Sequence, residues 1–149
     1  HPGVKVRRAE RGLRYAYYEG SWDSLPDFEK LTKSKTGVIS NIDISGRVQD
    51  NLFGFVFEGF ILIEEKGVYS FYTDSDDGSQ LLIGGDLVVD NNGLHSMTEA
   101  IGSIALDTGY QPILVTYFEK SGANLLDVYY ESAKIKKRSI PDNLLFHRK

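Results

Sequence analysis

The amino-acid sequence predicts a single all-β domain folded as an antiparallel two-sheet β-sandwich. Segments in which apolar and polar side chains alternate recur along the chain and are separated by short turn sequences, a pattern typical of hairpin-connected strands. Aromatic residues make up 12% of the chain, and aromatic side chains favour strands. The 149 residues suffice for one domain that buries roughly two-thirds of its unfolded surface, and we expect almost no helix.

The first half of the chain contains three predicted strands. Residues 13–19 (LRYAYYE) form the first, and a loop at 20–28 follows. Residues 37–44 alternate between apolar and polar side chains and are predicted to form the second. Residues 52–64 give the strongest strand pattern, with three phenylalanines on one face: Phe53, Phe55 and Phe57. Because the residues after Gly59 are all apolar, we expect either a bulge there or a strand covered on both sides.

The second half of the chain is predicted to consist of hairpins. A turn at residues 64–67 (EEKG) leads into an alternating strand that begins at Tyr69. Gly84-Gly85 forms a two-residue hairpin loop between two apolar segments. Residues 102–106 and 111–119 are expected to pair across another turn.

The predicted domain spans residues 12–146. Residues 1–11 are polar and basic and are predicted to be an N-terminal linker arm, with residues 147–149 as a C-terminal tail. The chain starts at His1 rather than Met and shows no signal peptide, so we expect a fragment of a longer protein or a processed chain. No stretch approaches the roughly 20 apolar residues that a membrane span needs.

The amino-acid composition argues against several classes of function. The net charge of −4 argues against nucleic acid as a partner, because phosphate binding favours a basic face. The chain has no cysteine, which excludes disulfides and thiolate chemistry but does not fix the compartment. His95 is the only histidine inside the predicted domain. Metalloenzyme or triad chemistry therefore has little support, and we predict no catalytic residue.

An acidic turn is the strongest candidate site. Asp74, Asp76 and Asp77 place three carboxylates within four residues, and Gly78 allows the chain to leave the turn with a positive φ. Such carboxylates repel one another unless they are solvated or neutralised by a hard cation such as calcium, which takes roughly 6–8 oxygen ligands. The alternative is a solvated acidic turn whose side chains bond the local backbone.

Two further features offer candidate sugar contacts. Asp90, Asn91 and His95 bring carboxylate, amide and imidazole groups into one polar loop, a set suited to sugar hydroxyls. The alternative for this loop is an ordinary Asx-type turn. Trp22 is the only tryptophan, and its ring would suit the apolar face of a pyranose. The alternative for Trp22 is a place in the core or at its rim.

Two ordered runs of residues resemble one known family. The first is 69–79 (YSFYTDSDDGS) followed by 82–95 (LIGGDLVVDNNGLH), and the second includes 102–106 (GSIAL) and 117–119 (YFE). Together they resemble the PA-fourteen domain, the β-sandwich module named after bacterial protective antigen. The resemblance covers about residues 12–145, which is most of the chain. It implies a β-sandwich that binds carbohydrate.

The resemblance also implies a set of site residues. In the sugar-binding members, fungal adhesins among them, two consecutive aspartates joined by a cis peptide hold calcium that ligates sugar hydroxyls. Asp76 and Asp77 match that pair, and Asn124 is our candidate for an asparagine that a later loop contributes. The expected Ca²⁺ ligands are thus Asp76, Asp77 and Asn124. The expected carbohydrate-binding residues are Asp76, Asp77, Asp90, Asn91, His95 and Trp22. Because those adhesins carry longer binding loops, we expect a difference in affinity or specificity.

The favoured hypothesis is a non-catalytic, carbohydrate-binding accessory module of a larger secreted or periplasmic glycoside hydrolase. The resemblance implies this, because such domains are commonly attached to bacterial glycosidases. The expected partners are a glycan or polysaccharide and the parent catalytic domain, and the expected location is extracellular, cell-surface or periplasmic. The alternative is a module that binds no sugar and braces a neighbouring catalytic domain. A third hypothesis, a hydrolase that pairs Asp77 with Glu119, needs carboxylates roughly 5–10 Å apart across a cleft.

Overall fold

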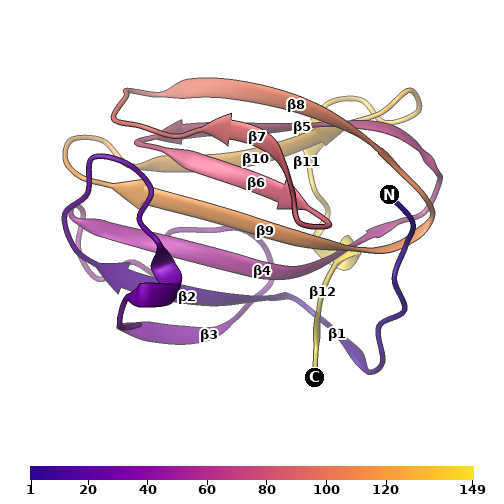
Figure 1. Ribbon diagram of the computed structural model, residues 1–149, viewed down its shortest axis with the longest axis horizontal. Coiled ribbons are helices and arrows are strands. Elements are labelled where there is room, and N and C mark those ends of the chain that lie inside the picture. Colours follow the sequence, from indigo (N-terminus) through magenta and orange to yellow (C-terminus); the bar gives the residue numbers. More distant parts are fainter.

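Two antiparallel sheets pack face to face in the computed structural model, which describes all 149 residues (Figure 1). The larger sheet contains β1 (Ala9–Arg11), β2 (Leu13–Glu19), β3 (Lys35–Ile39), β4 (Phe53–Ile63), β6 (Ser79–Ile83), β7 (Asp86–Asn91), β9 (Gly109–Glu119) and β12 (Leu145–Arg148). The smaller sheet contains β5 (Gly67–Asp76), β8 (Thr98–Leu106), β10 (Leu125–Glu131) and β11 (Arg138–Ser139). Two single turns of 3₁₀ helix, η1 (Phe28–Lys30) and η2 (Asp142–Leu144), are the only helical elements. The predicted all-β sandwich is confirmed.

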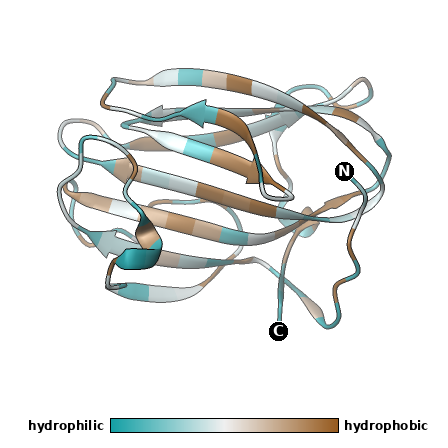
Figure 2. Cartoon of the chain, viewed as in Figure 1, coloured by the Kyte–Doolittle hydropathy of each residue, from teal (hydrophilic) through white to brown (hydrophobic).

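The core lies between the two sheets and is built from side chains at alternate strand positions. Figure 2 shows hydrophobic segments in β4, β6 and β9, and every second residue is buried along β6 and along residues 111–117 of β9. Phe53, Phe55 and Phe57 all face inward from β4 and are at most 1% exposed. From the smaller sheet, Phe71 and Tyr130 meet this layer and are equally buried. Because neighbouring strand residues point to opposite faces, one continuous core fixes the register of every strand that lines it.

Strand β4 resolves the ambiguity around Gly59. Its pairing with β9 runs without interruption through Gly59, which lies opposite Ile113, so no bulge is present there. The residues that follow are apolar because β4 is covered on both faces in this region. Phe60 faces outward beneath Tyr110 and Phe146, whose rings pack edge to face, and is 8% exposed. A register shift occurs instead between β6 and β7, where residues 81 and 82 lie opposite residues 89 and 87, so that Val88 of β7 is the extra residue.

Only one of the predicted hairpins is present, the one at residues 84–85. The predicted pairing of residues 102–106 with 111–119 is wrong, and the turn at residues 64–67 joins β4 to β5 in the other sheet rather than forming a hairpin. Gly84 and Gly85 have φ of 58° and 85° and join β6 to β7, as a two-residue hairpin requires. β8 and β9 pair with partners on different sheets, so the turn at residues 107–109 carries the chain from one sheet to the other. The predicted strand at residues 37–44 ends at Ile39, because β3 is an edge strand that pairs only with β2.

Both ends of the chain pack against the sandwich. The segment that we expected to be a linker arm forms β1, which pairs with β12 so that Ala9 lies opposite Arg148. Val4 makes an isolated bridge to Tyr110 farther toward the N-terminus. Residues 147 and 148, expected as a tail, belong to β12. The two terminal strands, β1 and β12, therefore complete one edge of the larger sheet, where the main-chain N–H and C=O groups of one strand hydrogen-bond to those of the other.

Candidate functional site

Three acidic residues meet where strands of both sheets end. Asp76 is the last residue of β5 in the smaller sheet, and Asp77 follows it directly. Glu119 is the last residue of β9 in the larger sheet and lies opposite Phe53. The peptide bond between Asp76 and Asp77 is cis, as the resemblance implied. Since β5 and β9 end on the same side of the sandwich, their terminal carboxylates share one space (Figure 1).

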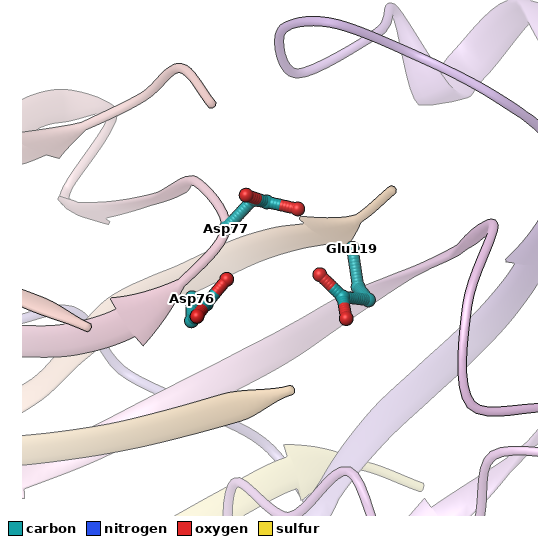
Figure 3. Close-up of side chains that lie close together, drawn as sticks. All are labelled: Asp76, Asp77 and Glu119. Carbon is teal, nitrogen blue, oxygen red and sulfur yellow. The ribbon is translucent and has the colours of Figure 1, made fainter. Parts of the chain in front are cut away.

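The three carboxylates face one another across a short gap. Each offers an oxygen atom, and these oxygens all lie within 4.8 Å of one another (Figure 3). Asp76 is 9% exposed, Asp77 is 6% exposed and Glu119 is fully buried. Three ionised carboxylates this close, and this far from water, repel one another strongly. The cluster therefore requires either protons or a cation.

Hydrogen bonds hold the two aspartates but leave Glu119 unsatisfied. The main-chain nitrogens of His95 and Lys120 donate to the two oxygens of Asp77, at 3.3 and 2.9 Å. The hydroxyl of Tyr117 donates to the main-chain oxygen of Asp76 at 2.5 Å. Neither carboxylate oxygen of Glu119 has a hydrogen-bond partner. Since buried polar atoms without partners are rare in native proteins, the two Glu119 oxygens point to a bound species at this place.

The electrostatics of the cluster favour protonated acids when no cation is bound. Burial, followed by the neighbouring carboxylates of Asp77 and Asp76, raises the pKa of Glu119 to about 9. Burial and the charge of Asp77 also raise the pKa of Asp76 above its ordinary value. A divalent cation between the three groups reverses this effect, because it stabilises the ionised forms. Cation binding at neutral pH is thus coupled to proton release.

The donor set fits a hard cation. All three side chains offer carboxylate oxygens, which calcium and magnesium prefer over nitrogen or sulfur ligands. The two oxygens of Glu119, which have no hydrogen-bond partner, are a second observation that favours a ligand between the three carboxylates. Sequence reasoning considered Glu119 only as one half of a hydrolase pair and missed it as a candidate metal ligand. Its signal was weak, because a glutamate that ends an alternating strand usually lies in solvent.

Asn124 lies next to the acidic pair, at the beginning of β10. Residue 125 is paired with Asp76 across β10 and β5, so Asn124 stands one position beyond Asp76, beside Asp77. Its side-chain nitrogen donates to the main-chain oxygen of Asp50 at 3.0 Å, which holds the amide in place. That bond leaves the side-chain oxygen as the atom for a cation.

The three candidates that we expected in one polar loop have different positions: Asp90 and Asn91 are the last two residues of β7, and only His95 lies in the loop that follows. Asp90 is exposed and accepts from the amide of Gln80 at 3.0 Å. Asn91 is 6% exposed, and its amide nitrogen bonds inside the sandwich to atoms of residues 73, 75 and 98. His95 is half-buried at the rim of the acidic cluster, with its ring nitrogens 2.8 Å from two main-chain oxygens. Only Asp90 and His95 therefore present side chains toward the surface.

Trp22 lies in the loop between β2 and η1 and is half-buried. Its ring packs edge to face on Phe28 with centroids 6.0 Å apart. The adjacent Asp23 accepts from the side-chain nitrogen of Lys120 at 2.6 Å, and Lys120 is the residue whose main chain binds Asp77. The loop is thus fastened to the acidic end of the sandwich and carries Trp22 near it.

Membrane insertion through a helix is not a feature of this fold, since none of its helices is long and apolar enough to span a bilayer. No protein of curated function gives a significant match to the chain.

Solved structures with the same fold include three informative cases. The PA14 domain of the MpAFP antifreeze protein is 19% identical, with 97% of this chain and 95% of that one covered and a TM-score of 0.79. A PA14 sugar-binding domain from an RTX adhesin is 18% identical, with coverages of 92% and 98% and a TM-score of 0.76. The epithelial adhesin 9 A domain from Candida glabrata, in complex with Galβ1-3GlcNAc, is 13% identical, with coverages of 100% and 97% and a TM-score of 0.74.

At these identities, the solved structures establish a shared fold. The sequence itself carries the stronger statement, because a family model described as the PA14 domain matches residues 10–144. That span includes the Asp76-Asp77 pair, Glu119 and Asn124. The chain belongs to the PA14 domain family.

Proposed function

We propose that this domain is a calcium-dependent carbohydrate-binding module. The observation that carries the proposal is the buried carboxylate of Glu119, whose oxygens have no hydrogen-bond partner and face Asp76 and Asp77. A hard cation satisfies all three groups at once. The carbohydrate part is supported by the family and by the sugar-binding adhesin domains that share the fold.

The proposed division of roles follows the geometry. Asp76, Asp77, Glu119 and the side-chain oxygen of Asn124 hold the cation. When bound, calcium offers coordination positions that vicinal sugar hydroxyls can fill in place of water. Around this centre, the exposed Asp90 and the half-buried His95 and Trp22 are proposed to contact the sugar.

The same geometry disfavours a hydrolase. A glycosidase needs two carboxylates that flank a bond across an open cleft, about 5 Å or more apart. The cluster oxygens lie within 4.8 Å of one another, and Glu119 has no exposed surface that a substrate could reach. We therefore propose a non-catalytic module in a larger extracellular, cell-surface or periplasmic protein, with a glycoside hydrolase as the favoured parent.

The deciding experiment is a glycan-array screen of the purified domain in calcium and again in EDTA. We expect binding to a defined set of glycans in calcium and its loss in EDTA. The Asp76→Ala/Asp77→Ala variant should lose binding, while Asp127→Ala, an exposed aspartate on the smaller sheet, should retain it. Binding that survives both EDTA and the double variant would exclude the calcium mechanism. No binding in either condition would favour a module that braces a neighbouring catalytic domain.

A further inference from the structure

A groove of about 620 Å³ lies on the outer face of the larger sheet. One wall is the loop that contains η1, which crosses in front of the sheet in Figure 1. This loop is held down by Phe28, whose ring packs on Tyr18 with centroids 4.9 Å apart. The volume falls within the roughly 300–1,000 Å³ that is usual for small-molecule sites.

The floor of the groove combines apolar and neutral polar side chains in two cross-strand rows. Strand register places Thr116 and Gln80 beside Val56 in one row, and Leu114 beside Leu82 in the next. All five side chains are half-buried, and they line the groove from β4, β9 and β6. No strand or helix covers these rows. A ligand in the groove would bury their valine and leucine side chains.

The chemistry of this floor matches a sugar chain. A pyranose has apolar C–H faces that suit the valine and leucine side chains, and its hydroxyls suit amide and hydroxyl groups such as those of Gln80 and Thr116. The charged rim carries Asp27, Glu29 and Glu58 against Lys33. This acidic excess disfavours a nucleic acid or another anionic ligand.

The polar loop connects the groove to the proposed calcium site. Asn92 lines one end of the groove and accepts from the main-chain nitrogen of Leu25, which ties the η1 loop to the polar loop. The same polar loop reaches Asp77 through the main chain of His95. Gln80 is the second residue of β6 and follows Asp77 by three residues, so the two main chains are at most about 10 Å apart.

We infer that this groove is a second subsite, which holds the following residues of an oligosaccharide whose end is bound at the calcium site. The inference rests on the proposed function and deepens it, because it assigns the ligand class: an uncharged oligosaccharide rather than a single terminal sugar. Affinity should therefore rise with the length of the sugar chain.

The test is calorimetric titration of the domain, in calcium, with monosaccharide to hexasaccharide series of gluco-, xylo-, manno- and galacto-oligosaccharides. For the series that binds, we expect the hexasaccharide to bind at least about tenfold more tightly than the monosaccharide. Leu114→Lys places a long charged side chain in the groove. It should reduce the ratio of hexasaccharide affinity to monosaccharide affinity to near one. Gln80→Ala should reduce it in part. Leu87→Lys is the matched control, because Leu87 is 50% exposed outside the groove, and its ratio should equal that of the wild type.

The outcomes separate the two proposals. A wild-type affinity that does not depend on chain length, or a ratio that Leu114→Lys and Gln80→Ala both leave unchanged, would overturn the groove as a subsite. If Asp76→Ala/Asp77→Ala still binds hexasaccharide and Leu114→Lys abolishes that binding, the groove stands and the calcium mechanism fails. If no series binds in calcium, both proposals fail. Thermal melts of each variant identify any loss that comes from unfolding.

Discussion

Replacing Glu119 with glutamine is the sharpest single test of the acidic cluster. The substitution keeps the shape of the side chain and removes its charge. In the folded protein without a cation, burial and the neighbouring carboxylates raise the pKa of Glu119 to about 9, whereas its ordinary value is 4.5. Between these two pH values, the folded state binds a proton that the unfolded state releases.

The sign and size of the effect follow from this difference. Because the folded state binds more protons than the unfolded state, the free energy of unfolding falls as pH rises from 4.5 to about 9. Each pH unit in that window lowers the free energy of unfolding by about 1.4 kcal/mol. In the absence of a cation, ionisable Glu119 therefore lowers it by about 3 kcal/mol at pH 7. Glu119→Gln should therefore stabilise the cation-free protein at pH 7 by up to about 3 kcal/mol, and by almost nothing at pH 4.5.

Calcium should cancel most of this difference in stability between the two proteins. A cation at 100 times its dissociation constant adds about 2.7 kcal/mol to the free energy of unfolding of the protein that binds it. The wild type should gain this stability, whereas Glu119→Gln has lost one charged ligand and should gain much less. The assay is urea unfolding from pH 5 to 9, in EDTA and in calcium chloride. Glu58→Gln, at an exposed position on β4, is the matched control and should behave as the wild type does.

Two results would refute this reasoning. One is a cation-free Glu119→Gln protein that is less stable than the wild type throughout the pH range, which would mean that the carboxylate is satisfied in some other way. The other is an equal gain from calcium in both proteins, which would place any calcium site elsewhere.

Two further predictions concern the scaffold around the site. Gly102→Ala should destabilise the domain by more than about 2 kcal/mol in urea unfolding, because a Cβ there would lie 1.6 Å from the main-chain oxygen of Val88. Gly67→Ala, where no atom lies within 4 Å of the new Cβ, should be near neutral, and equal effects at the two positions would contradict the packing argument. Asn91→Ala should lower the free energy of unfolding by about 1–3 kcal/mol, since it leaves the buried oxygens of Thr73 and the main-chain oxygen of Thr98 without this donor. An unchanged urea midpoint would show that these bonds add nothing.

Most of the fold could be predicted from short-range sequence patterns, such as the alternation of apolar and polar residues and the residues typical of turns. The strand at residues 13–19 has the bounds that its alternation indicated, and the glycine pair at residues 84–85 forms the hairpin that its chemistry requires. Gly59 shows the limit of this approach. An apolar run in a strand is compatible with a bulge or with cover on both faces, and only the unbroken pairing with β9 and the packing of Phe60 against Tyr110, about 50 residues away in the sequence, decide between them.

The candidate site was predictable where its residues are adjacent in the chain. Asp76 and Asp77 are neighbours in the sequence and carry a recognisable pattern. Glu119 reaches them only because β5 and β9, in different sheets, end on the same side of the sandwich. That coincidence depends on strand lengths and sheet packing, which no local pattern reports. Asn91 shows the opposite case, since its polar loop gave no sign that its amide turns into the interior.

The pairing of β1 with β12 has a mechanical consequence. Ala9 and Arg148 lie directly opposite each other, and both strands leave the sheet at the same end. Force applied through these two residues would break the β1–β12 bonds one after another, as in a zipper, rather than shear them all together. The carboxylate cluster lies at the far end of β9, nine residues and thus about 30 Å along the strand from Tyr110, which bridges Val4 of the N-terminal segment. Under force applied at Ala9 and Arg148, β1 and β12 would therefore separate first, while the end of the sandwich that carries the carboxylate cluster stays folded.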